Sequence, residues 1–241
     1  MAETTITRKD MKEPDKFQQA ATQAASWIAA RRKHVVLVGA IVIGLAIVLA
    51  VLQTIRQGRE ERAGQAASEL LSTAAGDVSA VPLPGLPGPF FPSEDAKQRA
   101  IADAAKRVLA EHPGTGAALL AALSLGDAEV RLRAWDDAKT AYEQYLAAAP
   151  PDDSLRFGAL EGIAIAEEAK GMLDAAAATY ERLGREVPAF ADRADLERAR
   201  LLARAGKVAD ARALLGTFGE KHKESLLTPD ATQLLARIGA K

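Results

Sequence analysis

The 241-residue chain contains no cysteine. This absence excludes disulfides, thiolate metal sites, cysteine nucleophiles and lipid attachment through an N-terminal cysteine, and therefore an outer-membrane lipoprotein. Phosphate-binding loops, dinucleotide fingerprints and nucleophile elbows are absent as well. The histidines His34, His112 and His222 lack metal-ligand spacing and are expected at the surface. Adjacent carboxylates, such as Glu167 and Glu168, point to different sides of a helix and are expected to be solvated.

These absences leave no chemistry for an active site. We therefore predict that the protein is not an enzyme and that it uses no metal, no cofactor and no small-molecule substrate. The formal net charge of -1 also gives no electrostatic reason to expect nucleic acid as a partner. The charge is unevenly distributed, however, because residues 1–34 carry seven Lys or Arg against four acidic residues. They form a basic arm.

Aromatic residues are scarce, at 5% of the chain, whereas alanine occupies 53 positions. Alanine is the best helix former, and strands favour aromatic and β-branched residues. The composition therefore predicts an all-α protein with essentially no sheet.

One long apolar run interrupts the polar sequence, from Val35 to Leu52. Its 18 residues contain no charge and no hydroxyl, and as a helix they span about 27 Å, close to the thickness of a hydrocarbon core. A signal peptide has a shorter apolar stretch near the chain start, whereas 34 residues precede this one. We predict an uncleaved transmembrane helix over 35–52. Arg31, Arg32 and Lys33 favour a cytoplasmic N-terminus and a body on the other side of the membrane.

Beyond this helix the sequence divides into three parts. A helical rhythm continues over 53–76 and predicts a helical spacer. Residues 77–92 include the run VPLPGLPGPFFP and predict a flexible linker rich in Pro and Gly. The remaining residues, 93–241, are expected to form one repeat domain.

An internal repeat organises this domain. Its pattern is a small residue, two large apolar residues and a proline at steps of four, three and five. Two antiparallel helices per unit explain the pattern, because small residues allow a close crossing and proline ends the second helix. Such units must stack to bury their apolar faces. The pattern occurs at Ala138, Tyr142, Tyr145 and Pro150, at Ala176, Tyr180, Leu183 and Pro188, and at Ala211, Leu215 and Phe218 with Lys223 in place of the proline, and a half repeat occurs at Ile101, Ala105, Val108 and Pro113.

The full units cover about 119–152, 157–190 and 192–225, and residues 228–239 are expected to form a capping helix. This pattern resembles the tetratricopeptide repeat family, although Ala122 and Glu129 replace the aromatic residues usual in its first helix. The expected fold class is therefore all-α, with a single N-terminal transmembrane helix followed by a tetratricopeptide-like solenoid of helical hairpins.

The order of arm, anchor, spacer and degenerate repeats also resembles the YfgM-like family, an ancillary subunit of the bacterial Sec translocon. The resemblance runs from about residue 17 to the end and includes the segment AEHPGTGAALLAALSLGDAEV. It implies an inner-membrane protein with a periplasmic repeat domain. Its implied partners are translocon subunits and periplasmic chaperones.

Stacked helix pairs curve, and the first helix of each pair lines the concave side, where a partner commonly binds. A groove in this position would be apolar and acidic in its first two units and basic in its third. A plain solvent-exposed face is the alternative for these residues. A scaffold for envelope or division machinery and a self-association module are the alternative functions. The predicted groove residues are Leu120, Leu123, Asp127, Glu161, Ile165, Glu168, Arg193, Leu196 and Arg200.

Overall fold

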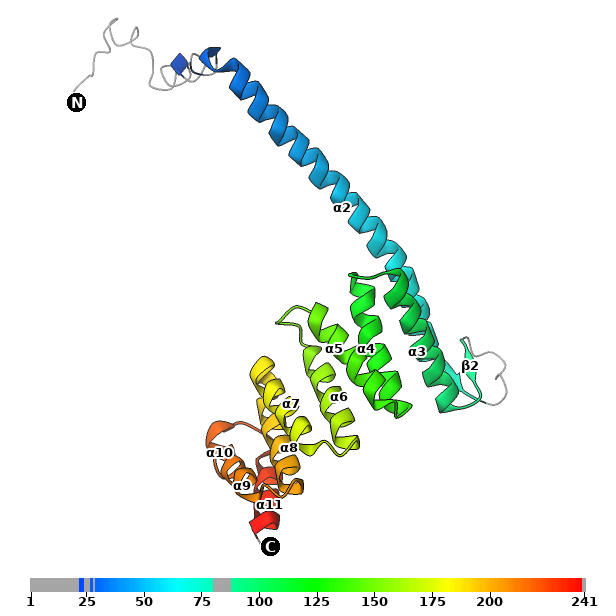
Figure 1. The fold of residues 1–241 in the computed structure, drawn as a ribbon, viewed down its shortest axis with the longest axis vertical. Coiled ribbons are helices and arrows are strands. Elements are labelled where there is room, and N and C mark those ends of the chain that lie inside the picture. The colour runs from blue at the N-terminus through cyan, green and yellow to red at the C-terminus, as the bar shows by residue number, and fades with distance from the viewer. Residues whose placement is uncertain (1–21, 24–26, 28, 80–87, 240–241) are drawn as a thin grey trace, which may run out of the picture. The chain divides into compact units, whose positions relative to one another are not determined.

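The computed structural model describes residues 22–23, 27, 29–79 and 88–239. Most of the basic arm and residues 80–87 of the Pro/Gly-rich segment lie outside this part. The described part is all-α apart from one two-residue strand pair, and Figure 1 shows how its helices follow one another. Its elements are α2 (Arg32–Ala75), β1 (Asp77–Val78), β2 (Phe90–Phe91), α3 (Glu94–Glu111), α4 (Gly116–Arg131), α5 (Trp135–Ala148), α6 (Arg156–Ala169), α7 (Leu173–Glu186), a 3-10 turn at Pro188–Phe190, α8 (Ala191–Arg204), α9 (Val208–Gly216), α10 (Phe218–Lys221) and α11 (Thr228–Gly239).

The chain consists of two compact units, one up to Gly58 and one from Arg59 onward. In the first unit, α2 contains an 18-residue window with a mean hydropathy of 3.2, none of it buried by other parts of the chain. By length and composition this helix can cross a membrane.

The second unit begins with the last part of α2, which packs on α3 and α4. Ala63 and Leu70 are buried in one cluster with Ile101, Ala105 and Val108 of α3, and in Figure 1 this end of α2 runs beside α3. The half repeat expected at α3 is thereby completed. Residues 59–75 belong to the packed repeat unit rather than to a separate spacer, because their alanine and leucine face needs an apolar partner.

The expectation of an all-α protein with essentially no sheet is confirmed, since the strands of the described residues are limited to a two-residue parallel pairing of β1 with β2. Asp77 pairs with Phe90 and Val78 with Phe91, and the backbone amide of Ser79 donates to the carbonyl of Phe91 at 2.8 Å. Gly76 is buried beside this pairing, where a Cβ would lie 2.6 Å from the carbonyl oxygen of Pro89. The ends of the Pro/Gly-rich segment are thus held together, and the segment connects two packed helices.

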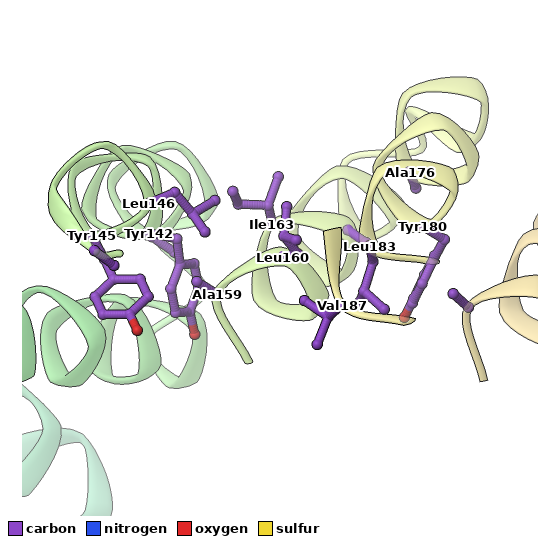
Figure 2. Packing of buried hydrophobic residues seen from close by; sticks show 14 of the residues in the cluster. Tyr142, Tyr145, Leu146, Ala159, Leu160, Ile163, Ala176, Tyr180, Leu183 and Val187 are labelled. Atoms are coloured by element: carbon purple, nitrogen blue, oxygen red, sulfur yellow. The ribbon is translucent and has the colours of Figure 1, made fainter. Parts of the chain in front are cut away.

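Small residues mark the helix crossings of the repeats. Ala138, Ala176 and Ala211 are fully buried, each on the second helix of a pair. Large side chains fill the spaces between the helices, and Figure 2 shows Tyr142, Ile163, Tyr180 and Leu183 among them. This is the packing expected of stacked helix pairs, in which neither helix can bury its apolar face alone.

Two successive junctions between repeats contain an ion pair in which the glutamate is buried and the lysine is partly exposed. Lys106 of α3 binds Glu129 of α4, and Lys139 of α5 binds Glu167 of α6, both at 2.8 Å. Both glutamate side chains are 6% exposed, so the expectation that Glu167 is solvated is wrong. The cause is tertiary, because the preceding helix pair covers that face of α6. At the third junction the position equivalent to Glu167 is Leu202, which packs against an apolar cluster that includes Ala177.

We predict that the ion pair of the second junction can be replaced by the apolar residue pair found at the third junction. Lys139→Ala should cost about 1–3 kcal/mol, because the Glu167 carboxylate would remain buried with only the Thr179 hydroxyl, at 2.7 Å, as its partner. The double variant Lys139→Ala/Glu167→Leu should recover most of this loss, since it reproduces the Ala177 and Leu202 pair. Urea unfolding measures both changes. Equal instability of the single and double variants would contradict the explanation.

Candidate functional site

The first helices of the three full repeats, α4, α6 and α8, each carry three of the nine predicted groove residues. Asp127, Ile165 and Arg193 are exposed, and the other six are half-buried. The structure therefore leaves all nine at least partly accessible to a partner. None of them belongs to the fully buried core.

Ion pairs join α6 to α8 across this face. Glu161 accepts from Arg193 at 2.6 Å, and Glu168 accepts two bonds from the Arg200 guanidinium at 2.8 and 2.6 Å. Arg204 also pairs with Glu168. The hydrogen bonds from Arg200 hold the pKa of Glu168 below its ordinary value. Bidentate pairs of this kind are stronger than single contacts and fix the orientation of both side chains.

The predicted contrast between an acidic and a basic part of the groove is therefore not what a partner meets. Glu161 and Glu168 of α6 are already neutralised by Arg193 and Arg200 of α8, within the same molecule. The other predicted groove residues of α6 and α8, Ile165 and Leu196, are apolar. Ile165 is 41% exposed, and the half-buried side chains of Leu120, Leu123 and Leu196 lie on the same set of helices.

At the start of the face, Asp127 is held by the second helix of its own repeat. The Tyr142 hydroxyl donates to Asp127 Oδ1 at 2.6 Å, and burial together with this bond raises the pKa of Tyr142. Asp127 also borders an open depression of about 370 Å³ between α3 and α4, to which Lys97 and Arg131 contribute. The face thus offers apolar side chains framed by polar groups of both signs.

Among the described residues, no three His, Asp or Glu side chains gather to form a metal site. The model of the tetratricopeptide repeat-like domain family matches residues 25–213. The chain belongs to this family. No curated protein matches the chain.

Tetratricopeptide repeat-like domains are typically non-catalytic modules that bind other proteins. The family match begins ahead of α2 and includes its whole length, which agrees with the packing of residues 59–75 against α3. In this tetratricopeptide repeat-like protein, the helices that carry the candidate groove are therefore those of a recognised protein-interaction domain.

The groove pairing was missed by sequence reasoning, although a signal was present. Glu161 and Arg193 are separated by 32 residues, and so are Glu168 and Arg200. A repeated separation close to the repeat length brings two side chains to neighbouring positions on adjacent first helices. Opposite charges at that separation indicate pairing within the chain.

The expected surface position of His222 is wrong. Its side chain is 11% exposed, and its Nε2 lies 2.8 Å from Oδ2 of Asp195, which also accepts from Lys221 at 2.6 Å. The buried carboxylate of Asp195 on α8 is the cause, because a buried carboxylate needs hydrogen-bond partners and the His222 ring supplies one. His34 is exposed and His112 is half-buried.

Acid should loosen the α6–α8 contact. Because the folded-state pKa of Glu168 lies below its unfolded value, its contribution to stability is present above the unfolded pKa and is lost as the pH falls through the folded pKa. Glu168→Gln should therefore show a smaller fall in melting temperature between pH 7 and strong acid than the parent. Glu143→Gln is the control, since Glu143 is 56% exposed and lies 3.8 Å from its lysine. An unchanged acid response of Glu168→Gln would contradict this assignment.

Proposed function

We propose that this protein is a membrane-anchored module that binds other proteins through the face of α4, α6 and α8. The observation that carries the proposal is the exposed apolar side chain of Ile165, together with half-buried leucines, on a face where Glu161 and Glu168 of α6 already pair with arginines of α8. A partner can bury these apolar groups without having to neutralise the arginines. Burial of such groups contributes about 25 cal/mol per Å².

We further propose that it acts as an ancillary subunit at the periplasmic side of the bacterial Sec translocon and links the translocon to periplasmic folding factors. The order of basic arm, apolar helix and repeats supports this role, as does the resemblance to the YfgM-like family. The anchor would strengthen binding to the translocon, since two proteins confined to one membrane meet at a much higher effective concentration than two soluble ones.

Site-specific photocrosslinking in cells tests this function. A photoreactive residue at Val42 in the apolar helix should capture a translocon subunit, and residues at Leu123 and Ile165 should capture periplasmic folding factors. Glu143, exposed on α5 and outside the candidate face, is the matched control and should capture neither. Capture of division or cell-wall proteins at Leu123 and Ile165 would replace this role by that of an envelope scaffold. Capture of the chain itself would indicate self-association.

The proposed orientation has its own test. The basic side chains Arg31, Arg32 and Lys33 favour a cytoplasmic N-terminus, so alkaline phosphatase fused after residue 241 should be active, because it folds only in an oxidising compartment. A fusion to a reporter that works only in the cytoplasm should be silent. The reverse pattern would place the repeat domain in the cytoplasm.

A further inference from the structure

One site recurs at each junction between successive helix pairs. It is bounded by the second helix of one pair and by both helices of the next pair. Its positions are related by the repeat spacing, 38 residues from the first full unit to the second and 35 from the second to the third. The chain fills this place differently at each junction. At one of the three junctions, large side chains are missing from this site.

At the junction of α5, α6 and α7, the place is filled by Arg156, Leu160 and Glu186. Leu160 is fully buried, and Arg156 is 7% exposed. The Arg156 guanidinium donates to the carbonyl oxygen of Leu146 at 3.0 Å and pairs with Glu186.

At the junction of α7 and α8 with the segment after α9, the equivalents of Leu160 and Glu186 are Asp195 and Lys221. They form an ion pair at 2.6 Å, and Nε2 of His222 lies 2.8 Å from the same Asp195 carboxylate. This ion pair occupies part of the place, and beside it an open depression of about 570 Å³ remains, lined mainly by charged and polar side chains such as Asp192, Lys221 and Glu224.

At the junction of α3, α4 and α5, the equivalents of Arg156, Leu160 and Glu186 are Ala118, Ala122 and Ala148. Three alanines leave the place hollow, and a pocket of about 240 Å³ opens there. Its remaining lining comes from Leu109, Pro113, Gly114, Thr115, Gly116, Leu119 and Gln144, so no charged side chain lines it.

The pocket is held open by contacts that do not depend on a filling group. The Arg59 guanidinium donates to the carbonyl oxygen of Pro113 at 3.0 Å, and Glu60 accepts from the backbone amide of Gly116 at 3.3 Å. Thr115 caps α4 and donates to the carbonyl oxygen of His112 at 2.7 Å. These bonds fix the loop between α3 and α4.

We propose that this pocket is a binding site for one apolar side chain, such as leucine, isoleucine or methionine, of a partner polypeptide. The place can hold a side chain, because Arg156 and Leu160 fill its equivalent at the junction of α5, α6 and α7. Its uncharged lining excludes an ion pair like those of the other junctions, and the Gln144 amide at its edge can bond a peptide group next to the inserted side chain. The site is separate from the face of α4, α6 and α8, and its test does not depend on that face.

Disulfide capture on the full-length chain in lipid nanodiscs tests the site directly. Because the chain has no cysteine, Gln144→Cys introduces a single thiol at the pocket edge. Small disulfide reagents that carry isobutyl, benzyl, aminoethyl, carboxyethyl or n-decyl groups then compete for it under reducing equilibrium, and mass spectrometry reports the product ratio. Glu143→Cys, next in sequence but outside the pocket, is the control.

The isobutyl and benzyl groups should be captured at least about tenfold more than the aminoethyl and carboxyethyl groups at residue 144, because burying a leucine-sized group is worth at least about a factor of ten. No such preference is expected at residue 143. Equal capture of all groups at residue 144 would overturn the proposal. A preference for n-decyl over isobutyl would assign the pocket to a lipid chain instead.

A second set of variants closes the pocket. Ala118→Arg with Ala148→Glu installs the arginine and glutamate of the next junction, and Ala122→Leu installs its leucine. Each should abolish the apolar preference in the Gln144→Cys background. Thermal melting identifies a variant that fails to fold, in which case the other one decides. Unchanged capture in a folded, closed variant would overturn the proposal.

Discussion

Gly162→Ala is expected to destabilise the repeat domain by at least about 3 kcal/mol, more than an ordinary overpacking change. A Cβ at this position would come within 3.0 Å of three atoms of the Tyr142 side chain. The ring cannot move away, because Gly126 approaches it from α4, where a Cβ would lie 2.5 Å from the ring. The Tyr142 hydroxyl is also held by Asp127 at 2.6 Å. Urea unfolding of the purified chain measures the loss.

Gly158→Ala is the matched control, one turn earlier in the same helix. Nothing lies within 4 Å of a Cβ at this position. Alanine should therefore stabilise the domain there by about 0.5–1 kcal/mol, since it lowers the entropy of the unfolded chain and favours helix. The two variants should change stability in opposite directions. If both stabilise the protein, the close approach of Tyr142 to Gly162 is not present in solution.

Arg156→Ala is expected to cost about 3 kcal/mol, the range for removing one partner of a buried ion pair. The Arg156 side chain is 9% exposed, and it donates to the carbonyl oxygens of Leu146 at 3.0 Å and Ala149 at 3.4 Å. These carbonyls end α5. Its removal leaves them and part of Glu186 without a donor, and it opens a cavity at the junction.

Arg182→Ala separates this effect from simple loss of charge. Arg182 binds the same carboxylate, Glu186, at 2.6 Å, but its side chain is 42% exposed. Exposed pairs contribute about 1 kcal/mol or less, so this variant should be far milder in the same unfolding measurement. Equal losses for the two arginines would show that burial does not set the strength of the cluster.

The pairing of charged residues on the candidate face has a consequence for recognition. Glu161, Glu168, Arg193 and Arg200 were expected to present separate acidic and basic regions, and the structure pairs them with one another. A charged partner would have to break bonds such as the 2.6 Å contact of Glu168 with Arg200. Apolar contacts at Ile165 require no such exchange, which favours partners that bury apolar surface.

Local sequence features determined much of this protein. The apolar run over 35–52, the helical periodicity and the small residues Ala138, Ala176 and Ala211 depend only on neighbours along one helix, and each lies in a helix in the structure. The buried state of those alanines follows from the same repeat pattern. Periodicity reports which side of a helix is apolar, and a repeat reports that such sides stack.

Only the tertiary structure decided which residues meet. Ala63 and Leu70 pack against α3, which lies on the other side of the Pro/Gly-rich segment in the sequence. The pairing of β1 with β2 joins the two ends of the same segment. Because both contacts join residues far apart in sequence, no local pattern indicates either of them. The pairing of Glu168 with Arg200 depends on the offset between α6 and α8. The hollow at Ala118, Ala122 and Ala148 exists because three small residues from two helices converge, and convergence is a property of the packed helices rather than of any one of them.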